Sequence, residues 1–406
     1  MDKSRIIKYC NRVIEVSLCA VVFYIPISNA LIESFAGLAI TAWLVKKIIS
    51  GDFLKRLFPR DFMSLPIWIY IAVMLVSAAL SSSRIISAKA FVFKYTEYLL
   101  LFFITSEIKD ARVLRNILIV FVFSVFLVNL DGIQQHFTSF DFLRQRTRVI
   151  AERINGPFST PNDFSNYLVA VLPVVACLSF IKFKRKWLRP FLAGLSFIIL
   201  LCLVLSATRA AWIAVVLALP LALFLRQRAL SLSGLVFIIL IACFMPFLPQ
   251  FSQSRITHFF YTHESGYFHR ELLWKMAVDM LSQRPFFGQG LGTFMFNFER
   301  FRPLNYPWHW EISYAHNCFL QMAAETGMFG LLSFVGVISV MFHAAFSRVR
   351  SMARNNNYYI ICGVCLGIFT YLVNSFFDTS LYSLSLSVLF WMMMGLCVAA
   401  IKMSES

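Results

Sequence analysis

The sequence has few charged residues. Asp, Glu, Lys and Arg together make up 14% of its 406 residues, whereas about a quarter is usual in a soluble domain. Acidic residues are the scarcest, with 20 Asp and Glu against 37 Lys and Arg, which leaves a formal net charge of +17. Because 59% of the residues are hydrophobic, so little charge excludes a chain of ordinary soluble domains.

Polar interruptions of the apolar runs are also rare. The runs repeatedly reach the ~17–25 residues that a helix needs to cross a bilayer. They are continuous and do not alternate over about ten residues, which argues against an outer-membrane barrel. The sequence therefore predicts an all-α, polytopic membrane protein with about twelve transmembrane helices, near residues 13–30, 31–49, 62–80, 89–105, 113–130, 164–181, 190–206, 210–225, 232–249, 316–346, 358–377 and 381–401.

Patterns that would indicate a metal, a dinucleotide or a disulfide framework are missing. The histidines of residues 251–315 lack ligand spacing such as H-x-x-x-H. "GQGLG" (288–292) has the wrong spacing for a dinucleotide fingerprint and follows no predicted strand, so we interpret it as a turn. The nine cysteines fall in or beside apolar runs, and "CGVC" (362–365) predicts two buried thiols. We expect no essential metal, no cofactor and no disulfide framework.

The basic residues predict the orientation. Connections rich in Lys and Arg face the cytoplasm, and here they are "KKIISGDFLKRLFPR", "KFKRKWLR", "RQR" and "SRVRSMAR". Both termini are then cytoplasmic, and the basic start without a small-residue cleavage site predicts a retained first helix. We expect one integral membrane domain, 1–406, with a large periplasmic loop region at 251–315 and a second periplasmic loop at 131–163.

The net charge points first to the membrane. The cytoplasmic bias and contact with anionic lipids explain most of it. No nucleic-acid-binding fold is apparent, so membrane lipids are expected partners and nucleic acid is not.

The two outward connections are nonetheless rich in arginine. They contain Arg144, Arg146, Arg148, Arg153, Arg255, Arg270, Arg284, Arg300 and Arg302, and Arg209 stands at the outward end of another span. Ion pairs with the few nearby acids could account for any one of these arginines. For the whole set we favour binding of a diphosphate, because arginine stays charged and grips phosphate with two parallel hydrogen bonds.

Helix direction supports an anion site at the same surface. Three spans that run inward present their N-termini outward, where partial positive charge favours anions. Asn162 or Asp163 is the expected N-cap of the first, Arg209 stands at the start of the second, and His316 at the start of the third. The sequence thus predicts a cationic, outward-facing pocket at the membrane surface, with Arg153 just upstream of the first helix.

His316 is the candidate proton acceptor in this pocket. A helix N-terminus and neighbouring arginines disfavour its protonated form, so we expect a neutral ring that acts as a general base or orients a hydroxyl. A satisfied structural histidine is the simpler alternative for an isolated residue at an interface. Glu325, nine residues further on, is interpreted as a structural partner.

An ordered set of motifs resembles a known family. From about residue 140 to the end, the chain is similar to the O-antigen ligase family (WaaL) and the related Wzy polymerases, through "RINGPFSTPNDFSNYL", "SATRAAW", "HRELLWKMAVDMLSQRPFFGQGLGTF" and "YAHNCFLQMAAETGMFG". The resemblance implies a glycosyltransferase fold of the GT-C type. It also implies transfer of O-antigen from undecaprenyl diphosphate to lipid A-core, on the periplasmic face of the bacterial inner membrane, without metal or ATP.

The resemblance also implies roles for individual residues. Arg209 and Arg270 match two essential arginines, the first of which engages the diphosphate. His316 matches the histidine assigned as base or orienting group, and Asp378 in "NSFFDTSLY" matches an acid important in ligases. Arg153, Arg148 and Arg144 are further candidates for phosphate contact. One departure is Ala210, since the family often has glycine after this arginine.

Three alternatives use different chemistry or none. A Wzy-type polymerase would extend a glycan on the same donor. A protein O-oligosaccharyltransferase would transfer the glycan to protein. A transporter or flippase of the lipid-linked glycan would form no bond, but such proteins often carry inverted repeats, and no convincing repeat is seen in this sequence.

Overall fold

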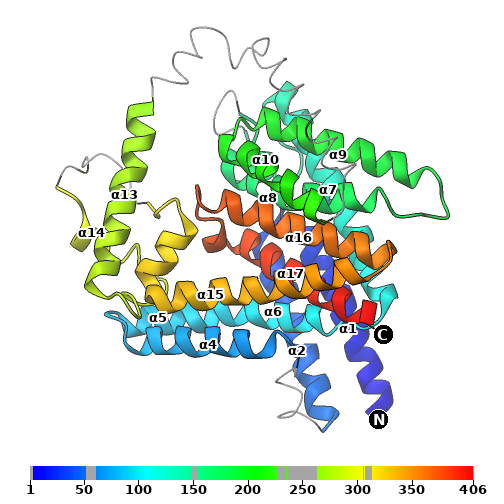
Figure 1. Cartoon of the computed structure of the whole chain (residues 1–406), viewed down its shortest axis with the longest axis horizontal. Helices are drawn as coiled ribbons and strands as arrows, with labels where there is room; N and C mark the ends of the chain where they lie inside the picture. The colour runs from blue at the N-terminus through cyan, green and yellow to red at the C-terminus, as the bar shows by residue number, and fades with distance from the viewer. Residues whose placement is uncertain are drawn as a thin grey trace.

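The computed structural model describes residues 3–51, 61–147, 153–225, 235, 263–304, 306 and 313–405. Apart from an isolated bridge between Phe140 and Thr147, regular structure in these residues is helical (Figure 1). The α-helices are α1 (Lys3–Tyr24), α2 (Asn29–Ile49), α4 (Ser64–Ala79), α5 (Arg84–Ala90), α6 (Thr96–Ser106), α7 (Ala111–Thr138), α8 (Pro161–Leu178), α9 (Leu188–Leu205), α10 (Arg209–Phe224), α13 (His263–Gln283), α14 (Phe298–Phe301), α15 (Cys318–Ser351), α16 (Asn356–Asn374) and α17 (Leu384–Glu405). A π-helical turn, Phe91–Tyr95, joins α5 to α6, and a short 3₁₀ helix, Ser380–Tyr382, precedes α17.

Several helices are suited to a membrane. Among the described residues, α7, α9, α15, α16 and α17 are long and apolar enough to cross one, and α4 and α10 are shorter apolar helices. The prediction of an all-helical chain with membrane-spanning helices is therefore confirmed for this part of the chain. A described helix overlaps each predicted span except 232–249, which lies outside the described residues apart from residue 235.

Helix α7 is longer than hydropathy predicts. It continues to Thr138, so the connection expected to begin at residue 131 begins with two further helical turns. Its extension carries buried polar side chains that bind the following loop. Asp131 Oδ1 accepts from the backbone N–H groups of residues 142 and 143, and Gln135 Oε1 accepts from those of residues 155 and 156. One oxygen of each side chain thus accepts two backbone hydrogen bonds, which helps these polar residues to remain buried at the end of the helix.

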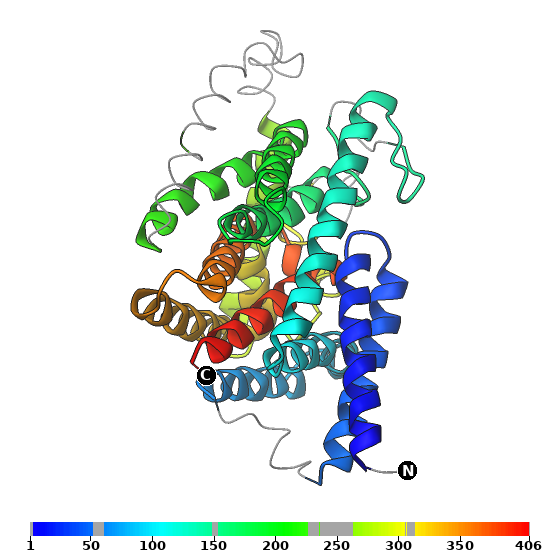
Figure 2. The same ribbon diagram turned by 90° about the vertical axis from the view of Figure 1, so that its right-hand side faces the viewer.

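Helices α8 and α17 form the centre of the bundle. Every residue of α8 from Phe164 to Leu178 is buried, and so is every residue of α17 from Ser385 to Ile401. Such all-round burial identifies helices enclosed by other helices. Helix α16 lies against both (Figures 1 and 2).

A glycine stripe sets the register between α16 and α8. A Cβ atom at Gly363 would lie 3.0 Å from Val174 Cα, and one at Gly367 would overlap the carbonyl of Ala170. Spacing of small residues by four positions lets two helix backbones approach closely. One turn further along, Thr370 donates a hydrogen bond to Val169 O at 2.6 Å. The start of α8 is thereby fixed beside the end of α16.

Helix α15 is broken at Gly327, whose φ of 69° and ψ of −175° are not helical. The turn after α13 fills the break: Met328 N donates to Pro285 O at 2.8 Å, and Gly290 N donates to Glu325 O at 2.8 Å. The Glu325 side chain accepts from the N–H groups of residues 292 and 294. The predictions of a turn at "GQGLG" and of a structural Glu325 are both confirmed.

Helix α13 forms a small second core that the sequence analysis did not predict. Its residues Leu272, Leu273, Met276, Ala277 and Met280 pack against Phe294, Phe298, Phe301, Tyr306, Ala315 and Ala324. This cluster includes the segment before α15 and the first part of α15 itself. Figure 1 shows α13 and α14 at the end of the bundle where α15 begins. The described part of the region 251–315 is therefore attached to the start of α15.

The opposite end of the bundle carries ion pairs. Lys47, at the end of α2, donates to Glu107 Oε1 at 2.6 Å beyond the end of α6. Lys402, near the end of α17, pairs with Asp61. Lys47 and Lys402, which are both predicted to face the cytoplasm, thus lie at one end of the described bundle.

Candidate functional site

His316 lies immediately before α15 in a constrained backbone conformation. Its φ is +48°, a left-handed value that costs a non-glycine residue about 1–2 kcal/mol. Its Nε2 lies 3.1 Å from Ser313 Oγ, and its Nδ1 lies 3.5 Å from Asp378 Oδ1. The His316 side chain is 29% exposed and that of Asp378 14%. An acid thus faces one ring nitrogen, and the other is turned toward a hydroxyl.

The start of α15 is not an open anion site. The Asn317 side chain caps the helix by accepting from the N–H groups of residues 319 and 320, each at 3.0 Å. Cys318 N donates to Ser375 O at 2.9 Å. The expectation that this N-terminus offers its amides to a phosphate is wrong, because the cap and the neighbouring helix already occupy them.

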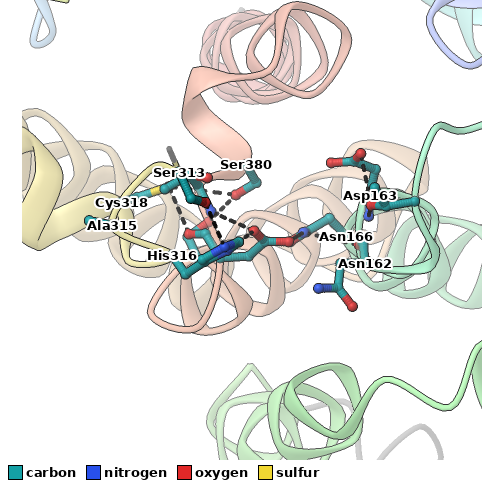
Figure 3. A network of polar contacts seen from close by, with 12 residues as sticks. Asn162, Asp163, Asn166, Ser313, Ala315, His316, Cys318 and Ser380 are labelled. Carbon is teal, nitrogen blue, oxygen red and sulfur yellow. Dashed lines mark hydrogen bonds and ion pairs between the residues drawn. The ribbon is translucent and has the colours of Figure 1, made fainter. Parts of the chain in front are cut away.

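The start of α8 also differs from the prediction. Thr160 is the N-cap, and its Oγ1 accepts from Asp163 N at 3.0 Å. The hydroxyl also donates to Asp163 Oδ2 at 2.9 Å. Neither Asn162 nor Asp163 is the cap, since Pro161 already occupies the first helical position, where proline is favoured. Asn162 is left to point away from Asp163 (Figure 3).

Asp378 is held by three elements. Its Oδ1 accepts from Thr379 N at 2.8 Å, and its Oδ2 accepts from Asn166 Nδ2 of α8 at 3.1 Å. The thiol of Cys318, the first residue of α15, donates to the backbone carbonyl of Asp378. Figure 3 shows these contacts running from His316 toward Asn166. The acid named from the sequence is therefore brought beside His316.

Arg153 joins the loop before α8 to the turn before α10. Its Nε donates to Ser206 O at 2.8 Å, and its Nη2 donates to Thr208 Oγ1 at 2.9 Å and Asn162 Oδ1 at 3.0 Å. Burial lowers the pKa of Arg153, and the like charges of Arg209 and Arg270 lower it further. The charges of both arginines thus act on Arg153, and Thr208, which Arg153 contacts, directly precedes Arg209.

These other two arginines come from different elements. Arg209 is the exposed first residue of α10, and its N-cap Thr208 makes no side-chain cap bond. The preceding Ala207 has a φ of +50°, which turns the chain between α9 and α10. Arg270 is half-buried on α13. Of the three helix starts predicted to attract an anion, the start of α10 agrees best with the prediction, because its first residue is Arg209.

Other predicted arginines have different partners or cannot be placed. Arg148 and Arg255 lie outside the described residues. Arg144 donates to Pro157 O, and Arg302 pairs with Glu299 at 3.3 Å. For Arg302, ion pairing is confirmed as the simpler explanation.

His269 is a site residue that the sequence analysis did not assign. Its ring centroid lies 6.3 Å from that of His316 in an edge-to-face arrangement, and its Nε2 lies 2.8 Å from Tyr306 Oη. Burial lowers the pKa of His269, with smaller effects from His316 and Arg270. The sequence feature that could have identified His269 is its position directly before Arg270.

No metal centre is found among the residues that the structure describes, where no three His, Cys, Asp or Glu side chains converge. A cavity of about 470 Å³ lies at the other end of α8 and α16, lined by Phe180, Lys182, Arg354, Asn355, Asn356, Asn357 and Tyr359. The 19 residues of α16 separate it from Asp378 by ~28 Å at 1.5 Å per residue. This cavity is therefore not part of the His316 site.

Comparison with known proteins supports the sequence resemblance. A family model described as O-Antigen ligase matches residues 194–335. The matched segment contains Arg209, Arg270 and His316, while Arg153 and Asp378 lie outside it. A comparison with curated proteins finds no match. The matched segment, which carries Arg209, Arg270 and His316, is therefore similar to the O-antigen ligase family.

Proposed function

We propose that the protein is an O-antigen ligase. It transfers O-antigen polysaccharide from undecaprenyl diphosphate to lipid A-core at the periplasmic face of the bacterial inner membrane, with inversion and without a metal or other cofactor. The observation that carries this proposal is the grouping of Arg153, Arg209 and Arg270, in the same part of the chain's fold as a histidine that faces an acid. The three arginines suit the negative charge of a diphosphate. The histidine and its acid suit a sugar hydroxyl.

The arginines would bind the donor and stabilise its leaving group. The donor enters laterally from the outer leaflet, and its phosphates contact Arg209, Arg270 and Arg153. As the bond between the anomeric carbon and the diphosphate oxygen breaks, negative charge grows on the diphosphate. Cations already in place stabilise that charge without rearrangement. The bond is activated in the donor, so no nucleotide is required.

His316 and Asp378 would handle the acceptor. In the tautomer whose proton is on Nδ1, which lies 3.5 Å from Asp378 Oδ1, Nε2 is the nitrogen that can accept a proton. The acceptor hydroxyl takes the position now facing Ser313 Oγ and attacks the anomeric carbon from the face opposite the diphosphate. Its proton passes to Nε2, or is oriented by it, while the new glycosidic bond forms. The 3.5 Å separation shortens in the complex, as catalytic hydrogen bonds often do.

The proposed topology follows from the two ends of the bundle. The site lies at the starts of α8, α10 and α15 and the end of α16, opposite the Lys47 and Lys402 ion pairs. Positive-inside bias puts the ion pairs in the cytoplasm and the site in the periplasm. We propose a GT-C type fold of about twelve spans, with both termini cytoplasmic and residues 251–315 and 131–163 as periplasmic regions of one membrane domain.

Reconstitution tests this function. Purified protein, lipid-linked O-antigen and lipid A-core are incubated without added metal or ATP, and the product is resolved on a gel. Wild-type protein should produce capped lipid A-core. His316→Ala should lower the rate at least about 100-fold, the usual contribution of a general base. His343→Ala, at an exposed position further along α15, is the matched control. Normal capping by His316→Ala would refute the assignment.

The same experiment separates the ligase from a polymerase. A Wzy-type polymerase would lengthen the glycan on its lipid carrier and leave lipid A-core uncapped. In cells, loss of a ligase leaves polymer on the carrier, whereas loss of a polymerase leaves single repeat units on the core. The description of the matched family favours the ligase.

A further inference from the structure

A chain of buried amides leads to the Asp378 carboxylate. Asn374 Nδ2, in the last turn of α16, donates to Asn166 Oδ1 of α8 at 2.6 Å. Asn166 Nδ2 then donates to Asp378 Oδ2 at 3.1 Å. The side chains of Asn166 and Asn374 are 0% and 1% exposed. With Asn374 fixing its oxygen, the Asn166 amide can present only its NH₂ group to the carboxylate.

The same amide also contacts the phosphate-binding side of the site. Asn166 Nδ2 donates to Asn162 O at 3.1 Å, and Asn162 Oδ1 accepts from Arg153 at 3.0 Å. One turn of α8 therefore connects Arg153 to Asp378, and Asp378 faces His316. Figure 3 shows Asn166 between His316 and Asn162.

The backbone beneath this connection is rigid. The Gly363 and Gly367 stripe presses α16 onto α8, and Thr370 bonds across to Val169. Asn374 follows Thr370 by one turn, so its distance to Asn166 is set by helix packing. Asn166 consequently has a fixed backbone, a fixed amide orientation and two acceptors.

We propose that Asn166 is a positioning residue that holds the Asp378 carboxylate toward His316 and ties this pair to Arg153. It keeps the proton-accepting and phosphate-binding halves of the site in one geometry. The inference rests on the proposed function for its catalytic meaning. A side chain that fixes the orientation of a functional acid usually changes activity by about 10–100-fold when removed.

The test is a double-mutant cycle on purified protein. Asn166→Leu keeps the side-chain size but removes the amide, and Asp378→Asn removes the carboxylate charge. Asn166→Leu alone should lower kcat about tenfold and change the KM for the lipid-linked donor much less. In the Asp378→Asn background the same substitution should have little further effect, because the two residues act through one interaction.

Asn129→Leu is the matched control. Asn129 is also a fully buried asparagine, but its Nδ2 donates to Val125 O of its own helix, α7. It should retain wild-type kcat. The positioning role is refuted if Asn166→Leu retains wild-type kcat as this control does. It is also refuted if the decreases in kcat caused by Asn166→Leu and Asp378→Asn multiply in the double variant.

A measurement without substrate separates this inference from the proposed function. The rate at which diethylpyrocarbonate modifies His316 is followed by mass spectrometry. A carboxylate facing Nδ1 increases the nucleophilicity of Nε2, so modification should be slower in Asn166→Leu than in wild type or Asn129→Leu. Equal rates would overturn the inference. Slower modification in a protein that transfers no glycan would support it while refuting the ligase function.

Discussion

At the scale of single residues, the site combines backbone strain with a network of buried hydrogen bonds. His316 holds a left-handed backbone, while Asn317 caps the helix that follows it and Asn166 donates to the neighbouring Asp378 carboxylate. Strained residues persist where their surroundings determine them, and functional sites are where they gather. Arg153 is likewise fixed by its surroundings, because it donates hydrogen bonds to three acceptors of the protein. Its positive charge nonetheless remains close to those of Arg209 and Arg270.

Arg153 provides the residue-scale prediction. Arg153→Met should lower kcat/KM for the lipid-linked donor about 10–100-fold, because hydrogen bonds to a charged group contribute about 1.5–3 kcal/mol each. Arg153→Lys should recover only part of the loss, since lysine keeps the charge without the planar fork. Initial rates against donor concentration measure both effects.

Arg146→Met is the control for charge. Arg146 is exposed in the same loop, and its loss should change kcat/KM by about twofold or less, as expected for a surface substitution. Equal losses for the two methionine variants would mean that general loop charge, and not Arg153, binds the donor.

At the scale of elements, helices could be predicted more readily than their ends. Continuous apolar runs place α9, α10 and α16 within a few residues. The end of α7 was missed because buried Asp131 and Gln135 look like loop residues until their partners are known. Thr160 was missed as a cap because Asn162 and Asp163 are equally good capping residues by type.

The turn that fills the break in α15 gives the element-scale prediction. Gly290 has a φ of +119°, and an added Cβ would overlap the Ser81 side chain. Gly290→Ala should therefore destabilise the protein by about 1–3 kcal/mol and reduce transfer, because the segment carrying His316 loses its support. Thermal denaturation in detergent and the transfer assay test this.

Gly37→Ala is the matched glycine control. Gly37 lies within α2, with nothing within 4 Å of an added Cβ, so alanine should be neutral or stabilise by up to about 1 kcal/mol. A Gly290→Ala protein as stable and active as Gly37→Ala would show that the close approach to Ser81 is unimportant.

At the scale of the whole molecule, the sequence motifs identify several residues of the site but not the contacts between them. Arg209, Arg270, His316 and Asp378 could be named from the sequence, because their residue types and motifs carry the chemistry. The pairing of Asn166 with Asp378 spans 212 positions, and no local pattern indicates it. Helix packing between α8 and α16 creates it.

Labelling from outside the cell tests the proposed topology. Thr147→Cys and Lys184→Cys place thiols at exposed positions in the connections after α7 and α8. In spheroplasts, a membrane-impermeant maleimide should label residue 147 at once and residue 184 only after lysis. The described native cysteines are buried except Cys19, which is half-buried, so background should be low. The reverse pattern would invert the topology.

The break at Gly327 has a mechanical consequence. It separates the first nine residues of α15 from the long remainder, and those nine residues pack with Ala315 and α13 through Ala324. His316 and Arg270 are thus anchored to the same small unit, and Cys318 joins this unit to the end of α16 by donating its N–H to Ser375 O and its thiol to Asp378 O. The short first part of α15 is therefore a physical link between the α13 region and the main bundle, so a shift of either one would reach the imidazole and its neighbouring carboxylate together.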